Sequence, residues 1–268
     1  MLFGRRLRAC RAEWRRPTVK HVNGLVIAID GPSGSGKSST ARGVAQRLGL
    51  AYLDTGAMYR SITWLALHEG TDLADADAIA ALAADAEIEI NGDPAAPAFR
   101  VNGHDVTAAI REPRISENVS RIATNLRVRD ILVADQRRRI AEARMDGGIV
   151  VEGRDITTVV APESEVRVLL VADREARIAR REAELAGAAD TAAVTDQVVR
   201  RDRDDSTVAA FTEAAEGVTV VDSTHMGLDE VIDRICAMAD PASTPISETP
   251  DPQTSDPQTS SPESLSKE

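Results

Sequence analysis

Between about residue 24 and residue 240, short runs of consecutive apolar residues alternate with longer stretches whose apolar residues recur every three or four positions. The short runs are GLVIAID, AYLD, GGIVVEG, VRVLLVA and VTVVD, at 24–30, 51–54, 147–153, 166–172 and 218–222. Such runs are typical of strands that are buried on both faces, as in a parallel sheet covered by helices. The pattern therefore predicts an α/β fold in which helices flank a five-stranded parallel sheet.

Helical periodicity is clearest in two stretches. KSSTARGVAQRLGL, at 37–50, contains Gly49 near its end, the residue type that most often ends a helix, and LDEVIDRICAMA occupies 228–239. One stretch interrupts the alternation. At 87–106, two short β-type pieces surround a turn rich in proline and glycine, and helical segments follow. We expect residues 60–130 to form an inserted domain that binds a substrate.

The two ends differ in composition from the middle. Residues 1–23 carry seven Lys or Arg against one Glu, which is typical of a basic arm or a transit peptide, or of a leader added by an upstream start codon. Residues 241–268 repeat the sequence DPQTS and hold too few apolar residues to offset the entropy of ordering. We expect a domain at 24–240 between a disordered basic extension and a disordered acidic tail rich in proline, serine and threonine. A phosphorylated or partner-docking tail is the alternative.

Composition narrows the classes of function. The net charge of −11 and the pI near 5.0 differ from the basic surface of proteins that bind nucleic-acid backbones. An apolar run of about 18 residues, which a membrane span needs, is absent from the sequence. The two cysteines, Cys10 and Cys236, have no metal-binding spacing, which favours a reducing cytoplasm over a disulfide framework or a zinc site. We expect a cytoplasmic monomer with neither nucleic acid nor membrane as a partner.

The stretch GPSGSGKSS lies between the first predicted strand and the first predicted helix. Gly31, Gly36, Lys37 and Ser38 satisfy the phosphate-binding pattern G-x-x-x-x-G-K-[ST], known as the P-loop. Backbone N–H groups and the helix N-terminus then converge on a phosphate, Lys37 reaches the β- and γ-phosphates of ATP, and Ser38 places its hydroxyl on Mg²⁺. A purely structural turn is the alternative. The residues expected to hold ATP are Gly31, Pro32, Ser33, Gly34, Ser35, Gly36, Lys37, Ser38 and Ser39.

A second group of charged residues follows the strand predicted at 147–153. Glu152 lies at the end of this strand, where P-loop proteins commonly keep an acid near the metal, and Arg154 and Asp155 come next. Because ligands bind at the carboxyl ends of parallel strands, we expect Ser38 and Glu152 near the metal. A solvated surface turn is the alternative. For the stretch REARIARRE, a solvated helix face accounts for most of the charges.

Several separated motifs together resemble the bacterial-type cytidylate kinases. They are IDGPSGSGKSS, LDTGAMYR, VEGRDITTVV and RRDRDDST, and the resemblance runs from about Val26 to Ala239. It implies the P-loop NTPase fold, with an inserted monophosphate-binding domain and a helical lid at 174–205. It also implies transfer of the γ-phosphate of ATP to CMP or dCMP. Thr55, Tyr59 and Arg60 lie in the second motif, which binds the monophosphate in this family.

The resemblance also assigns roles within the acceptor site. Arg60 and Arg154 would hold the acceptor's phosphate in the fork geometry that guanidinium groups offer. Asp155 would accept from the cytosine amine, while Ser120 and Arg129 would donate to the ring nitrogen and carbonyl. Uracil would place a carbonyl against the carboxylate, so CMP should be preferred to UMP by about 1 to 3 kcal/mol. Asp205 would contact the sugar hydroxyl.

The implied chemistry needs no general base, because the attacking phosphate monoester is already deprotonated near neutral pH. Catalysis would rest on Lys37, Arg154 and Arg201 together with Mg²⁺, which align the two phosphates and stabilise the transferring group. One position departs from the family pattern. Val208 follows the sequence DST, where many members have an arginine. Either another lid arginine takes its place, or turnover is lower.

Two alternative functions stay open. A related P-loop kinase, acting on UMP, AMP, dTMP or a metabolite such as shikimate, would share the ATP site and differ in the acceptor pocket. A non-catalytic P-loop protein would use residues 1–23 to bind RNA while ATP switches its conformation, although the acidic composition argues against it. Measuring which acceptors are phosphorylated would distinguish a related P-loop kinase from a cytidylate kinase. Salt-dependent RNA binding without phosphoryl transfer would indicate the non-catalytic protein.

Overall fold

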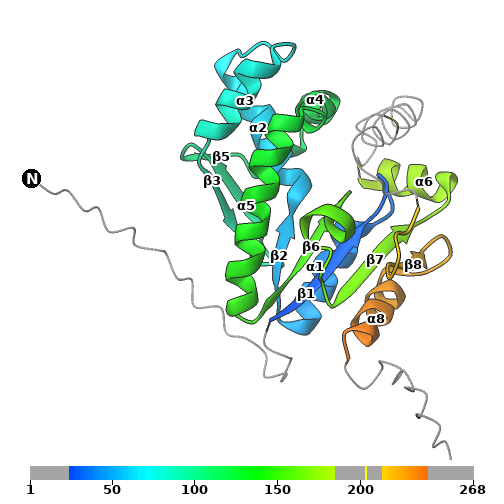
Figure 1. Cartoon of the computed structure of the whole chain (residues 1–268). Helices are drawn as coiled ribbons and strands as arrows, with labels where there is room; N and C mark the ends of the chain where they lie inside the picture. Colours follow the sequence, from blue (N-terminus) through cyan, green and yellow to red (C-terminus); the bar gives the residue numbers. More distant parts are fainter. Residues whose placement is uncertain (1–23, 185–202, 204–212, 241–268) are drawn as a thin grey trace, which may run out of the picture.

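The computed structural model describes residues 24–184, 203 and 213–240. Within them, five strands form one parallel sheet with the order β2-β6-β1-β7-β8 (Figure 1). The strands are β1 (Leu25–Asp30), β2 (Ala51–Asp54), β6 (Gly148–Gly153), β7 (Val166–Val171) and β8 (Thr219–Asp222). Each strand begins and ends within one residue of an apolar run seen in the sequence. The predicted α/β fold with its five-stranded parallel sheet is confirmed.

Helices cover both faces of this sheet (Figure 1). They are α1 (Lys37–Leu48) and α8 (Leu228–Met238) on one face, and α2 (Thr55–Glu69) and α5 (Leu126–Met145) on the other. Alternate residues of β1 point to opposite faces, so that Ile27 and Ile29 pack with α1 and α8 while Val26 and Ala28 pack with α2 and α5. Both faces of the strand are therefore apolar, as its continuous apolar run requires.

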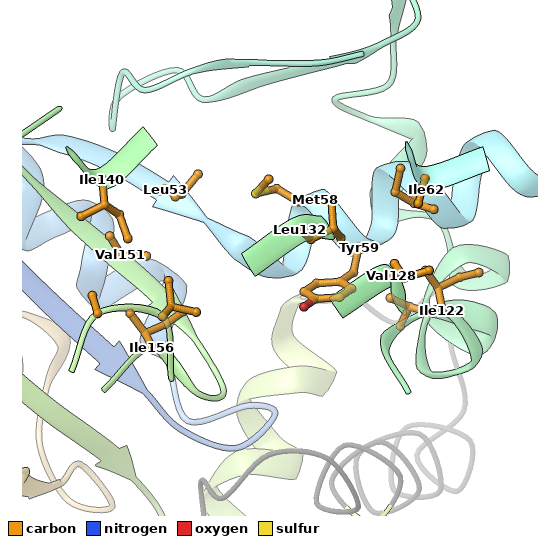
Figure 2. Packing of buried hydrophobic residues seen from close by; sticks show 14 of the residues in the cluster. Leu53, Met58, Tyr59, Ile62, Ile122, Val128, Leu132, Ile140, Val151 and Ile156 are labelled. Atoms are coloured by element: carbon orange, nitrogen blue, oxygen red, sulfur yellow. The ribbon is translucent and has the colours of Figure 1, made fainter. Parts of the chain in front are cut away.

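The core on the α2 and α5 side extends from the sheet into the segment between β2 and β6. Leu53 and Val151 of the sheet belong to the same buried cluster as Ile62 and Ile122 on helices farther out (Figure 2). Tyr59 lies between these two groups (Figure 2). Because apolar packing is continuous across this region, side chains carried by α2 and α5 are held in place relative to the sheet.

The segment between β2 and β6 also contains a small antiparallel sheet with the order β3-β4-β5. After α2 the chain forms α3 (Ala76–Asp85), β3 (Ile88–Asn91), β4 (Ala98–Val101), β5 (His104–Asp105), the 3₁₀ turn η1 (Ala109–Arg111) and α4 (Pro113–Ala123). The apolar pattern indicated β3 and β4 but not β5. Asn102 and Gly103, with φ of 48° and 79°, form the tight turn that pairs β5 with β4. The expected limits at 60 and 130 fall inside α2 and α5, and they stay a prediction.

The order of the strands brings two loops together. The chain passes from β1 to β2 on one side, returns through β6 between them, and then crosses to β7 on the other side of β1. The carboxyl ends of β1 and β6 are therefore adjacent, with Asp30 opposite Gly153 in the register. The P-loop follows β1, and Arg154 and Asp155 follow β6. Parallel α/β sheets bind ligands at such a reversal of strand order.

The expected lid begins with α6 (Arg174–Glu184). Outside the described residues lie most of the rest of this lid, the two expected disordered ends, and Arg201, Asp205 and Val208. Among the helices that the structure describes, none combines the length and the apolar character needed to cross a membrane.

Candidate active site

A cavity of about 630 Å³ opens at the carboxyl ends of β1, β2 and β6. It is lined by most of the residues that the sequence proposed for ATP and for the acceptor: Ser33, Gly34, Gly36, Lys37, Ser38, Ser39, Thr55, Tyr59, Arg60, Arg129, Glu152, Arg154 and Asp155. Of the proposed residues that the structure describes, four do not line it, namely Gly31, Pro32, Ser35 and Ser120. One continuous cavity therefore contains side chains from both proposed halves of the site.

The backbone of the P-loop adopts conformations that require glycine. Gly34 and Gly36 have φ of 77° and 86°, in the left-handed region that residues with a Cβ rarely adopt. A Cβ at Gly34 would also lie 2.6 Å from the carbonyl oxygen of Arg177. Gly36 is the residue before α1, so the first N–H groups of that helix face the loop. This arrangement suits an anion such as a phosphate group.

Two arginines of α6 contact the outside of the P-loop. Arg177 Nη1 donates to the carbonyl of Ser33 at 3.1 Å, and Arg180 Nη1 donates to that of Ser35 at 3.3 Å. Arg180 also donates to the carbonyl of Ser223, at 2.5 Å. These two guanidinium groups bind backbone carbonyls. They are therefore exceptions to the solvated helix face that we expected for most charges of this stretch. Arg181, on the same helix, lines the cavity.

Glu152 and Ser38, the proposed metal-binding residues, lie next to each other. The Glu152 side chain is buried, accepts from the Tyr52 hydroxyl at 2.6 Å and hydrogen-bonds the Ser38 hydroxyl. Burial, followed by the charge of Asp54, raises the pKa of Glu152, while Lys37 opposes that change. A carboxylate and a hydroxyl beside the P-loop lysine form an oxygen donor set that fits Mg²⁺, which takes few protein ligands and keeps waters and phosphate oxygens.

Asp54 holds two arginines that line the cavity. Its carboxylate accepts from Arg60 Nη2 at 2.7 Å and from Arg111 Nη2 at 3.0 Å, and it caps α2 by accepting from the N–H of Ala57 at 2.8 Å. Burial alone would raise the pKa of Asp54. The two guanidinium groups and the Ala57 N–H outweigh burial and hold the pKa at about 2. The Arg60 Nε is buried and has no hydrogen-bond partner among the described residues.

Two of the three residues proposed to read the base, Arg129 and Asp155, form an ion pair. Arg129 Nη2 donates to Asp155 Oδ2, and both side chains are mostly buried. Burial raises the pKa of Asp155, and the Arg129 guanidinium opposes that change. Beside them, the Tyr59 ring is buried, which raises the pKa of its hydroxyl to about 12. A donor and a charged acceptor therefore lie side by side next to an apolar ring, as a flat polar ligand would require.

Arg154 connects the segment after β6 to the P-loop. Its Nη1 donates to the carbonyl of Gly31 at 2.5 Å, and its side chain lines the cavity. The predicted neighbours of the metal, the phosphates and the base thus come from four separate segments of the described chain. Lys37 and Ser38 follow β1, Arg60 lies on α2, Arg129 on α5, and Glu152 to Asp155 end β6. This geometry is suited to two phosphate-bearing ligands.

The comparisons with known proteins agree with this geometry. A family model described as Cytidylate kinase matches residues 27–240. The chain belongs to the cytidylate kinase family. The cytidylate kinase of Cutibacterium acnes is 56% identical over 213 residues, which cover 79% of this chain and 94% of that protein. The cytidylate kinase of Rhodococcus opacus is 44% identical over 226 residues, covering 83% and 97%. The predicted resemblance is confirmed, and the protein is a nucleoside monophosphate kinase.

The residues that line the cavity of this cytidylate kinase family member although the sequence did not single them out include Asp54, Arg111 and Ser116. Asp54 stood inside a quoted motif, so its position before Thr55 could have marked it as a helix cap. Ser116 lies on α4 one turn before Ser120, and it is Ser116 whose side chain lines the cavity. Arg111 offered no local pattern, because its partner is 57 residues away.

Proposed function

We propose that the protein transfers the γ-phosphate of Mg-ATP to CMP or dCMP through the residues that line the cavity described above. The observation that carries this proposal is the joining of the P-loop and the Asp155–Arg129 pair in one cavity of about 630 Å³. A pocket of that size accommodates two small ligands in contact. A phosphate-binding loop at one end and a pair suited to a base at the other support donor and acceptor sites that meet between them.

On the donor side, the P-loop N–H groups would bind the phosphates of ATP and Lys37 would lie beside the β- and γ-phosphates. Ser38 and Glu152 would hold Mg²⁺, directly or through water. The bound ion would neutralise charge on the phosphates. Asp54 and Lys37 are close enough for the lysine to lower the pKa of the Asp54 carboxyl. Lys37 would thereby lie between the P-loop and the acceptor side of the cavity.

On the acceptor side, the phosphate of CMP would meet the guanidinium groups of Arg60, Arg154 and Arg111. The first two follow from the family resemblance, and the third from its position in the cavity and its contact with Asp54. Guanidinium forks match the geometry of phosphate oxygens. Thr55 would lie at the same end, where its hydroxyl donates to the Glu152 carbonyl at 2.8 Å.

The base would be read by Asp155 and Arg129. Asp155 accepts from an amine and cannot donate when ionised, which favours cytosine over uracil. Ser120 stays a proposed donor from the family resemblance, and it lies on the same helix as Ser116. By the same resemblance, Asp205 would contact the sugar and Arg201 the phosphates.

The phosphoryl group would transfer directly between the two nucleotides. The acceptor phosphate is the nucleophile and is ionised near neutral pH, so positioning and charge stabilisation supply the catalysis. Lys37, Arg154 and Arg201 would stabilise the charge that spreads over the transferring group. Closure of the 60–130 insert and the 174–205 lid would exclude water and prevent ATP hydrolysis. A monomeric state and a cytoplasmic location stay predictions.

The experiment that tests this proposal is a change of acceptor selectivity in Asp155→Asn. We expect its kcat/KM for CMP to fall about 10- to 100-fold, because the amide places an N–H₂ group near the amine of cytosine. The value for UMP should fall less, so that the CMP to UMP ratio decreases. Asp130→Asn is the control, since Asp130 is exposed and does not line the cavity. An unchanged ratio in Asp155→Asn would contradict the proposed base reading.

A further inference from the structure

Asp30, the last residue of β1, is buried and does not line the cavity. Its Oδ1 accepts from the N–H of Ile156 at 2.9 Å. Its Oδ2 accepts from the N–H of Thr157 at 2.8 Å and from the Thr157 hydroxyl at 2.7 Å. Both partners belong to the first turn of the short π-helix η2 (Ile156–Val160), which directly follows Arg154 and Asp155. The carboxylate therefore holds the far end of the segment that carries two acceptor-site residues.

The near end of the same segment is also fixed to β1. Gly153 pairs with Asp30 in the parallel register, and a Cβ at Gly153 would lie 2.6 Å from Thr55 Oγ1. Arg154 donates to the carbonyl of Gly31, the first residue of the P-loop. The segment from Gly153 to Thr157 is thus attached to the start of the ATP-binding loop at both of its ends.

These contacts need a carboxylate rather than any polar group. Each Asp30 oxygen faces donors only, and an ionised carboxylate has two acceptor oxygens for them. An asparagine in the same place would keep one carbonyl oxygen and turn an N–H₂ group toward N–H or O–H donors. Burying a charge is unfavourable unless it is well hydrogen-bonded, as it is here. Burial raises the pKa of Asp30, and the hydrogen bonds from Thr157 and Ile156 oppose that change. The structure therefore keeps a buried carboxyl group at a point where its loss would disturb the segment after β6.

We propose that Asp30 is a positioning residue that fixes Arg154 and Asp155 relative to the P-loop, and so sets both acceptor choice and alignment of the two phosphates. This inference rests on the proposed function, in which Asp155 reads the base and Arg154 holds the acceptor phosphate. Asp30 acts through these two residues and contacts neither nucleotide. Its loss should therefore affect the acceptor more than ATP.

The test compares Asp30→Asn and Thr157→Val with the unmodified full chain. The measured quantities are kcat, the KM for CMP, the KM for ATP, and the ratio of kcat/KM values for CMP and UMP. We expect Asp30→Asn to lower kcat/KM for CMP about 30- to 100-fold and to reduce the CMP to UMP ratio about 10-fold, with the KM for ATP within about threefold of the unmodified chain. Thr157→Val removes only the hydroxyl donor. We therefore expect the fold-changes in kcat/KM for CMP and in the CMP to UMP ratio to be about one third as large as in Asp30→Asn.

Val221→Ala is the control for loss of stability. Val221 is buried in the core beneath α8, and its truncation should lower the melting temperature without changing the CMP to UMP ratio. If folded Asp30→Asn keeps the ratio and the KM for CMP of the unmodified chain, the inference is wrong. If Asp30→Asn does not fold, Thr157→Val replaces it in the test, and the inference is wrong if Thr157→Val keeps the ratio and the KM for CMP of the unmodified chain. An unmodified chain without CMP preference would overturn the proposed function, whereas a CMP preference that survives both variants would overturn this inference alone.

Discussion

Asp54→Asn is a substitution whose effect follows closely from the structure. Asparagine has nearly the shape of a protonated aspartate and is an equally good helix cap, so the contact with the Ala57 N–H is retained. The substitution removes the negative charge of Asp54, with which both Arg60 and Arg111 form ion pairs. The buried Arg60 side chain would then lack its counter-ion, which is the costly way to break a buried ion pair.

The magnitude comes from the pKa of the Asp54 carboxyl. Burial raises this pKa, but the two guanidinium groups and the Ala57 N–H outweigh burial and lower it from 3.8 to about 2. Compared with the unfolded chain, the folded protein therefore favours the charged over the neutral Asp54 carboxyl by about 2.5 kcal/mol. Because the folded pKa lies below the unfolded one, this stabilisation is fully present well above pH 3.8 and is lost as the pH falls toward 2. By pH 3, about 1 kcal/mol of it is gone.

The assay is urea unfolding of the unmodified chain and of Asp54→Asn at about pH 7 and about pH 3. We expect the variant to be about 2.5 kcal/mol less stable at neutral pH, and this difference to shrink by about 1 kcal/mol at the lower pH. Asp75→Asn is the control, because Asp75 also caps a helix, α3, but is exposed. A difference below about 0.5 kcal/mol at neutral pH, or one that does not depend on pH, would refute the reasoning.

Three further substitutions test other parts of the account. Arg111→Ala should raise the KM for CMP about 10- to 100-fold in steady-state assays and leave the KM for ATP unchanged, whereas Arg114→Ala, which removes an exposed side chain, should change neither. In Gly153→Ala the new Cβ would crowd Thr55, and thermal unfolding should show a loss of about 1 to 3 kcal/mol. Val208→Arg should raise kcat about 10-fold, and an unchanged kcat would mean that another arginine already supplies that charge.

The strands and the P-loop could be predicted because their causes are local. A strand buried on both faces needs a continuous apolar run, and the GPSGSGKSS stretch carries the glycine and lysine spacing of its loop within nine residues. The short strand β5 was missed because two residues are too few to show a period, although Asn102 and Gly103 are typical of a tight hairpin turn.

The interactions that organise the site could not be predicted, because their partners lie far apart in the sequence. Asp30 and Thr157 are 127 residues apart, and Asp54 and Arg111 are 57 apart. Neither pairing follows from a motif, since each depends on which strands and turns become neighbours in space. Even within one helix, the family resemblance indicated Ser120, whereas Ser116, one turn earlier, is the serine that lines the cavity.

The central claim is that this cavity selects a cytosine monophosphate as the acceptor of the ATP γ-phosphate. The most direct test is ADP release from Mg-ATP by the full chain, measured separately with CMP, dCMP, UMP, AMP and dTMP. The account predicts kcat/KM values for CMP and dCMP that exceed that for UMP by at least about 10-fold, with AMP and dTMP lower still. Equal or faster turnover of UMP, AMP or dTMP, or ADP release that does not depend on any acceptor, would contradict it.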